Sequence, residues 1–219
     1  MPTASAASDC LTSPQISAGG TSAKAEFFVC LARAFQPPGT PAARNAFAHD
    51  LAGDLAELAG EAGYELGPRL DRFAAHSVDA ERQLLEDYSA LFLVSPVPVP
   101  LNAGLYVDGG LLGRMTQAML ERYREAALEP DTHFHDLPDH VTMQLEYVAV
   151  MFSRAAEGDY AAAARAREFL DQFVLAWLPG FMRALRAASE RIPAARAYGA
   201  LAAILEATAQ REAAAPGSE

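Results

Sequence analysis

The stretch of residues 138–157 constrains the fold of this chain more than any other. Its apolar residues fall on two helical stripes: Val141, Leu145, Val148 and Phe152 on one, and Met143, Tyr147, Val150 and Met151 on the other. A helix that is apolar over most of its circumference has to be covered on several sides. We therefore predict a central helix here, surrounded by other helices.

The rest of the chain repeats the helical pattern between breaks that contain proline or glycine. Helices are predicted over residues 22–36, 41–60, 77–92, 111–126, 160–178 and 181–190, with a short one after Gly67-Pro68 and a last one after Pro193. Ser77 is expected to cap the start of its helix, and Pro179-Gly180 to separate two helices. The one alternating stretch, residues 97–100, is excluded as a central strand by its prolines.

These patterns predict an all-α protein with a single globular helical domain. The domain is expected over residues 22–212, because residues 1–21 are rich in Ser, Thr, Ala, Gly and Pro and are predicted to form a flexible tail. Residues 213–219 are expected to be frayed. A chain of 219 residues with 51% hydrophobic content is long enough to bury a sizeable core.

The net charge of −11 is unevenly distributed. Acidic residues are in excess over residues 46–90 and 121–159, and arginines over residues 165–196. This balance argues against a nucleic-acid partner, because such affinity comes largely from basic groups on phosphates. It favours a partner that carries Arg or Lys. On charge alone, surplus acid that simply keeps a helical protein soluble remains the alternative.

The sequence contains no run of about 18 apolar residues, so no membrane insertion is expected. The N-terminus lacks a basic region followed by an apolar core, which predicts a cytoplasmic protein. Cys10 lies in the predicted tail and Cys30 in an apolar helix. Neither a structural disulfide nor a cysteine-based metal site is therefore expected.

Motifs of catalysis are missing. No Gly-rich loop precedes a Lys, no Gly-x-Ser-x-Gly turn occurs, and Gly109-Gly110 opens a helix without a preceding strand. His133, His135 and His140 lie among acidic residues, but their spacing fits no closed zinc site. We expect no enzymatic activity and no cofactor, and a helical protein that binds a metal through His and carboxylate groups is the alternative.

The central helix is entered through Leu137-Pro138-Asp139-His140. Proline in a first turn loses no needed hydrogen bond, Asp136 can cap free N–H groups, and Asp139 suits the positive end of the helix dipole. On this interpretation the motif is a well-capped helix start.

An acidic loop followed by Pro-Asp-His and a helix resembles the hallmark of the TorD/DmsD/NarJ family of cytoplasmic chaperones. Further pieces follow in the family's order: residues 88–92, a Pro-containing loop ending in residues 100–106, Leu145-Glu146 and residues 169–181. The resemblance implies an all-helical protein that binds the twin-arginine signal peptide and the apo catalytic subunit of a molybdenum oxidoreductase. Such a protein assists cofactor insertion before export.

The resemblance also implies seven signal-peptide-binding residues: Tyr88, Phe92, Pro100, Tyr106, Asp139, His140 and Glu146. Asp139 and His140 match the family's Asp-His pair, in which a carboxylate can accept hydrogen bonds from a peptide Arg. Glu146 lies seven positions later, nearly on the same helical face. It can extend an acidic track or pair internally with an Arg of residues 165–196.

Tyr88 and Phe92 match an aromatic pair that is four residues apart in the family and can form an apolar floor for the peptide. Ordinary core packing is the alternative for this pair. Pro100 and Tyr106 match loop positions, although Ala103-Gly104 stands where the family often has Ser before the aromatic residue.

Two questions about the partner stay open at this point. The client can be an exported subunit, or a respiratory reductase subunit that stays in the cytoplasm, as in the NarJ-like branch. The chain can act as a monomer or as a domain-swapped homodimer, for which residues 157–159 are a candidate hinge.

Overall fold

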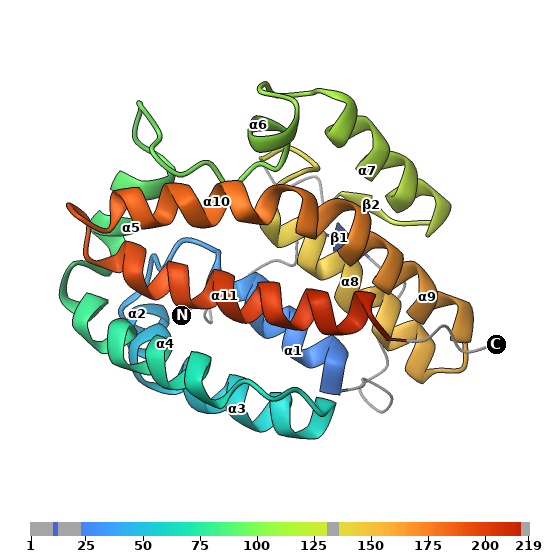
Figure 1. Ribbon diagram of the computed structural model, residues 1–219, viewed down its shortest axis with the longest axis horizontal. Coiled ribbons are helices and arrows are strands. Elements are labelled where there is room, and N and C mark those ends of the chain that lie inside the picture. Colours follow the sequence, from blue (N-terminus) through green and yellow to red (C-terminus); the bar gives the residue numbers. More distant parts are fainter. Residues whose placement is uncertain (1–10, 13–22, 131–135, 216–219) are drawn as a thin grey trace, which may run out of the picture.

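The computed structural model describes residues 11–12, 23–130 and 136–215, and their fold is helical (Figure 1). The helices are α1 (Ala23–Ala34), α2 (Pro41–Asn45), α3 (Leu51–Ala62), α4 (Gly67–Ala80), α5 (Leu84–Phe92), α6 (Gly104–Val107), α7 (Arg114–Glu125), α8 (Val141–Ala156), α9 (Tyr160–Phe169), α10 (Leu175–Ala188) and α11 (Ala194–Ala213). Among the described residues the only strands are β1 (Leu11–Thr12) and β2 (Glu129–Pro130), which form one antiparallel pair. The predicted all-α fold with a single helical domain is confirmed.

Three short helical turns of other pitch connect these helices. A π-helical turn at Ala46–Asp50 joins α2 to α3, and another at Leu170–Val174 joins α9 to α10. A 3₁₀ turn at Glu81–Gln83 joins α4 to α5. The helix α6 was not predicted from the sequence, and α7 begins at Arg114 instead of Leu111.

The predicted central helix is α8. Every one of its residues from Val141 to Ser153 is buried, and its main neighbours are α1 and α9. On the other side of the core, α11 packs against α4 and α10, and α1 also contacts α3. Figure 1 shows α10 and α11 across the middle of the molecule, with α3 and α4 along one edge and α6 and α7 along the opposite edge.

No helix starts at Ser77. The short helix predicted after Gly67-Pro68 is α4, which continues through Ser77 to Ala80, and the rest of the predicted helix 77–92 forms the 3₁₀ turn and α5. The Ser77 hydroxyl is fully buried and lies within hydrogen-bond distance of the carbonyl oxygens of Ala48 and Ala74, at 3.0 and 3.1 Å. The Ser77 hydroxyl thus forms hydrogen bonds with the preceding turn of its own helix and with a facing segment, and it does not cap a helix. The local capping signal was therefore misleading.

The predicted interruption at Pro179-Gly180 does not occur, because α10 continues across it. Pro179 lies on the exposed side, and its neighbours Leu178 and Phe181 are buried. The loss of one N–H and the local clash of the proline ring are outweighed by burial of the flanking apolar side chains. The departure from α-helical pitch falls earlier, in the π-helical turn.

A buried carboxylate fixes the end of α11. Glu212 is 2% exposed and accepts hydrogen bonds from Lys24 Nζ at 2.5 Å, the Tyr64 hydroxyl at 3.0 Å and Arg167 Nε at 3.3 Å. Burial, reinforced by the Glu212 charge, raises the pKa of the Tyr64 phenol. Because a buried charge that loses its partners is costly, this cluster holds α11 against α1 and α9.

The longest helix is α11, with 20 residues. In the part of the chain that the structure describes, no helix combines the length and the apolar composition needed to cross a membrane.

Candidate functional site

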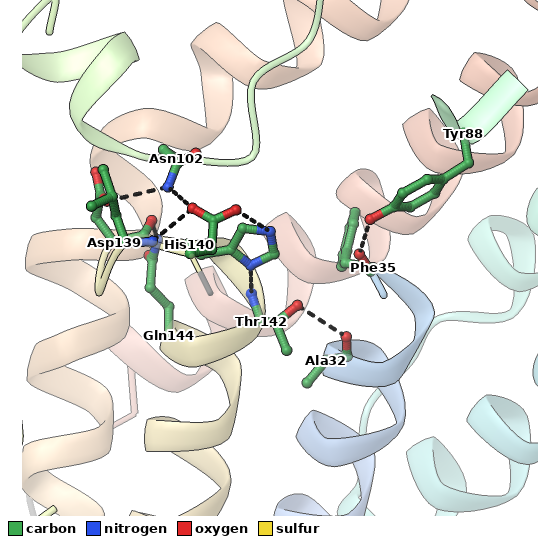
Figure 2. A network of polar contacts seen from close by, with 10 residues as sticks. Ala32, Phe35, Tyr88, Asn102, Asp139, His140, Thr142 and Gln144 are labelled. Carbon is green, nitrogen blue, oxygen red and sulfur yellow. Dashed lines mark hydrogen bonds and ion pairs between the residues drawn. The ribbon is translucent and has the colours of Figure 1, made fainter. Parts of the chain in front are cut away.

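The stretches 100–106 and 137–140 lie side by side in the structure (Figure 2). Asn102 and His140 form an antiparallel bridge. Two backbone hydrogen bonds flank it, from Ala103 N–H to the Asp139 carbonyl at 3.1 Å and from Val141 N–H to the Leu101 carbonyl at 2.9 Å. The chain before α6 is thereby fastened to the chain before α8.

This pairing shifts the start of the central helix. The sequence predicted a helix from Pro138, whereas α8 begins at Val141 after extended backbone at His140, with φ −63° and ψ 139°. Backbone groups that bond to a neighbouring segment cannot at the same time form the first helical turn. The inference that Asp139 and Glu146 share a helical face was therefore wrong, since Asp139 precedes the helix.

The carboxylate of Asp139 is completely buried. Its Oδ2 accepts a hydrogen bond from Gly104 N–H at 2.8 Å, and its Oδ1 accepts one from the Asn102 side-chain amide at 3.3 Å. Gly104 has no space for a side chain, because a Cβ there would lie 2.9 Å from Asp139 Oδ2 and 3.0 Å from the Gly110 carbonyl oxygen. Hydrogen bonds to a carboxylate are stronger than those between neutral groups. Asp139 is thus a buried attachment point for α6.

His140 is the N-cap of α8. Its Nδ1 accepts a hydrogen bond from Thr142 N–H at 3.2 Å, which places the proton of the neutral ring on Nε2, 3.9 Å from Asp136 Oδ2. Burial lowers the pKa of His140, opposed in part by the charges of Asp136 and Asp139. His140 is 7% exposed and caps α8. In an ordinary helix start, a side chain at this position would face the solvent.

Gln144, in the first turn of α8, connects Asp139 to α10. Its side-chain nitrogen donates to the Asp139 carbonyl at 2.7 Å, and its side-chain oxygen accepts from Trp177 Nε1 at 2.9 Å. Both side chains are buried. Each bond therefore satisfies a polar group that would be costly to bury alone.

Tyr106 packs α6 onto α10. Its hydroxyl donates to the Pro100 carbonyl at 2.8 Å, and its ring lies 6.1 Å from the rings of both Trp177 and Phe181. A Cβ on Gly180 would lie 2.9 Å from a Tyr106 ring carbon, so this close approach needs a glycine. Burial raises the pKa of the Tyr106 phenol. Tyr106 and Pro100 are both half-buried.

Tyr88 and Phe92 lie apart from Asp139, in an aromatic cluster. The Tyr88 hydroxyl donates to the Phe35 carbonyl at 2.9 Å (Figure 2), and the rings of Tyr88 and Phe92 are 4.9 Å apart. Both rings also pack on Tyr198. Tyr88 is 1% exposed and Phe92 6%, so in this conformation the pair belongs to the core.

The structure therefore brings four of the seven predicted site residues together, namely Pro100, Tyr106, Asp139 and His140. Glu146 lies on α8 and is 6% exposed. Arg167, one of the arginines considered as its internal partner, bonds to Glu212.

Sequence reasoning did not assign Asn102, Gly104 or Gln144 to the site. Asn102 and Gly104 lie within the stretch 100–106, so the resemblance pointed to their position without giving them a role. Their function becomes visible only when the Asp139 carboxylate, 35 residues later, is placed against Gly104.

Accessible apolar surface lies on segments that flank this buried network. Seven large apolar side chains are exposed among the described residues, and five of them lie between residues 93 and 112: Leu93, Val94, Val107, Leu111 and Leu112. Leu93 and Val94 begin the Pro-rich loop after α5, and the other three follow or end α6. Exposed apolar groups that form a contiguous patch are typical of interaction surfaces, and these five are close to one another along the chain.

A groove on another part of the molecule is lined by residues of α2, the α4–α5 junction and the start of α11, among them Arg44, Arg82, Asp87 and Pro193. None of the seven predicted site residues lines it. The Asp87 carboxylate accepts a hydrogen bond from Ala194 N–H at 3.0 Å, so this wall of the groove is fixed to the start of α11.

Metal-ligand groups of three or more residues are absent from the described ranges. His133 and His135, which belong to the metal hypothesis, lie outside them. Burial, with a smaller effect of Asp54, raises the pKa of the Cys30 thiol to about 11. A thiol of this kind is a poor nucleophile at neutral pH.

The fold is also found in a solved structure. The chain is similar to the crystal structure of "a putative redox enzyme maturation protein from Archaeoglobus fulgidus", with a TM-score of 0.51 and 18% sequence identity over 85% of this chain and 93% of that one. At this identity the likeness establishes the helical fold alone. A search of curated protein sequences gives no match.

Residues 46–183 match the model of the nitrate reductase delta subunit family, which is well over half of the chain. The chain therefore belongs to this NarJ/TorD-type family, as the motifs of the sequence indicated. Its members are chaperones in redox enzyme maturation and are not catalysts, which confirms the coarse functional prediction.

Proposed function

We propose that this chain binds the twin-arginine signal peptide of the catalytic subunit of a molybdenum oxidoreductase in the cytoplasm. It would hold the apo subunit until the cofactor has been inserted. Family membership supports the chaperone role. The observation that carries the finer proposal is the gathering of exposed apolar side chains between residues 93 and 112.

The apolar part of a leader peptide needs an apolar surface to bind. Leu93, Val94, Val107, Leu111 and Leu112 are each at least 45% exposed, so they are available without any rearrangement of the fold. Val107 ends α6 and the other four sit on connections between helices, where binding residues are commonly found because a rigid scaffold positions them.

The basic part of a leader needs a carboxylate that it can reach. The Asp136 side chain is 44% exposed, and its Oδ1 accepts a hydrogen bond from the Asn102 amide at 3.0 Å. Asp136 thus offers accessible negative charge beside the buried Asp139 and His140. A peptide arginine can pair with such a carboxylate, and the net charge of −11 would favour the approach of a basic segment.

We assign two kinds of role to the seven predicted site residues. The half-buried Pro100 and Tyr106 would border the bound peptide. The five buried residues would support this surface from beneath, or contact the peptide only after the covering chain moves: Tyr88, Phe92, Asp139, His140 and Glu146.

Calorimetric titration tests the proposal, with a synthetic twin-arginine leader from an oxidoreductase subunit of the same genome as the probe. Ordering a disordered peptide costs free energy, so we expect a Kd of roughly 1 µM. The Leu111→Ser/Leu112→Ser variant should bind about tenfold more weakly. Val78→Ser is the matched control, because Val78 is 50% exposed but lies on α4.

A folded wild-type chain that binds no such leader would contradict the proposal. Equal weakening by Val78→Ser would also contradict it, because the apolar contact would then not be specific to residues 93–112.

A client that is not exported is the second candidate, favoured by the nitrate reductase named in the family description. A leader in which both arginines are replaced by glutamine separates the two. Unchanged affinity would indicate recognition of a segment without an export signal. A large loss would indicate recognition of the arginine pair.

A further inference from the structure

We infer that Asp139 is a positioning residue: its buried carboxylate fastens the segment of residues 101–113, and this fastened segment presents the apolar side chains to the client. The presentation to the client rests on the proposed function. The fastening of residues 101–113 by Asp139 concerns the chain alone.

Both oxygens of the Asp139 carboxylate are used within the protein. Oδ2 accepts from Gly104 N–H at 2.8 Å, and Oδ1 accepts from the Asn102 amide at 3.3 Å. The residue is completely buried. While the segment is in place, a peptide arginine has no access to this carboxylate.

Gly104 makes the attachment possible. A Cβ at this position would lie 2.9 Å from Asp139 Oδ2, closer than real Cβ contacts, and 3.0 Å from the Gly110 carbonyl oxygen, which is tighter than most of them. The Gly110 carbonyl belongs to the same segment, so the chain folds back over Gly104. An alanine here has to push the carboxylate or this turn away.

Two further contacts hold the segment beyond Gly104. Tyr106 lies against α10 where Gly180 leaves room for its ring. Asp108 Oδ2 accepts a hydrogen bond from Met115 N–H, in the first turn of α7, at 2.7 Å. One side of the segment is therefore attached to the chain that leads into α8, to α10 and to α7.

The other side of the same segment is apolar and accessible. Val107, Leu111 and Leu112 are 45%, 54% and 62% exposed. Loss of the hydrogen bonds to Asp139 would make these three side chains more mobile. A loss of client affinity in Asp139 variants would then arise through the segment, without any contact between Asp139 and the peptide.

The test compares variants from both ends of the attachment. Asp139→Ala removes both acceptor oxygens. Gly104→Ala leaves the carboxylate intact but disturbs its bond. Asp139→Asn removes the charge and keeps one acceptor oxygen for Gly104 N–H. Gly199→Ala is the matched control, since a Cβ at Gly199 in α11 meets no atom within 4 Å.

The first readout is hydrogen exchange of the full chain without any peptide. We expect faster exchange over residues 101–113 in Asp139→Ala and Gly104→Ala, with α1 and α11 unchanged, and wild-type exchange in Gly199→Ala. Faster exchange throughout the molecule would overturn the inference, because Asp139 would then merely stabilise the fold. Wild-type exchange over residues 101–113 in Asp139→Ala would overturn it as well.

The second readout is the affinity for the leader peptide used above. We expect Asp139→Ala and Gly104→Ala to weaken binding by about tenfold each, their combination to weaken it no further, and Asp139→Asn to stay within about threefold of wild type. A direct contact with a peptide arginine predicts the opposite: Asp139→Asn as weak as Asp139→Ala, and Gly104→Ala unaffected. If the wild type binds no leader, the proposed function fails. The exchange result still decides whether Asp139 fastens residues 101–113.

Discussion

His140 holds the start of α8 with a ring nitrogen that cannot both accept a hydrogen bond and carry a proton. Its Nδ1 accepts from Thr142 N–H, and burial lowers its pKa in the folded chain. In the unfolded chain the pKa of the ring returns to its ordinary value of 6.5. At the scale of single residues, this difference links the stability of the protein to pH.

Above pH 6.5 the titration of His140 should leave the free energy of unfolding unchanged. As the pH is lowered from 6.5 toward the depressed pKa of the folded state, the free energy of unfolding should fall. The sign follows because the unfolded chain binds the proton first. His140→Asn retains a side-chain acceptor for Thr142 N–H but does not titrate. Urea denaturation at successive pH values should show a shallower fall in this variant, and an identical fall in both proteins would contradict the assignment.

The importance of Asp139 could be predicted from the sequence, but the orientation of its side chain could not. The sequence drew attention to Asp139 but placed it in the first turn of the central helix, whereas the structure places it before α8. Its orientation could not be predicted, because the groups that bind the carboxylate, Asn102 and Gly104, lie more than 30 residues earlier in the chain. Whether a carboxylate faces solvent or backbone is decided by such long-range contacts.

At the scale of helices, one side chain couples α8 to α10. Gln144→Leu would leave the buried Trp177 indole N–H without its partner, at a cost of about 1–3 kcal/mol, and Trp177→Phe would leave the Gln144 oxygen unpaired. The double variant should lose about 1 kcal/mol less than the sum of the single losses. Urea denaturation of the four proteins measures this coupling energy, and strictly additive losses would show that the hydrogen bond contributes nothing.

Helices were predictable where the apolar period is long and regular, as in α8 and α11. Their boundaries were not predictable where a distant segment competes for the same groups. Ser77 carried a capping signal but bonds to Ala48 of another segment. Pro179 carried a break signal, but packing on both sides keeps α10 continuous. The start of α8 moved because residues 139–141 pair with residues 101–103.

At the scale of the whole molecule, the polar motif residues lie inside and the accessible apolar residues lie on the connections around them. Asp139, His140 and Gln144 fix the junction of α6, α8 and α10 from within. Val107, Leu111 and Leu112 lie on the chain that this junction positions, and Leu93 and Val94 lie in the loop that leads to it. The proposed place of binding is therefore the outer surface, and the residues of the family motif support it from within.

Hydrogen exchange of the full chain, measured with and without a saturating twin-arginine leader peptide, tests whether the client binds at this outer surface. We expect slower exchange over residues 93–113 on peptide binding and little change along α3 and α4. Slower exchange confined to the groove lined by Arg44, Arg82 and Pro193, with residues 93–113 unchanged, would contradict it.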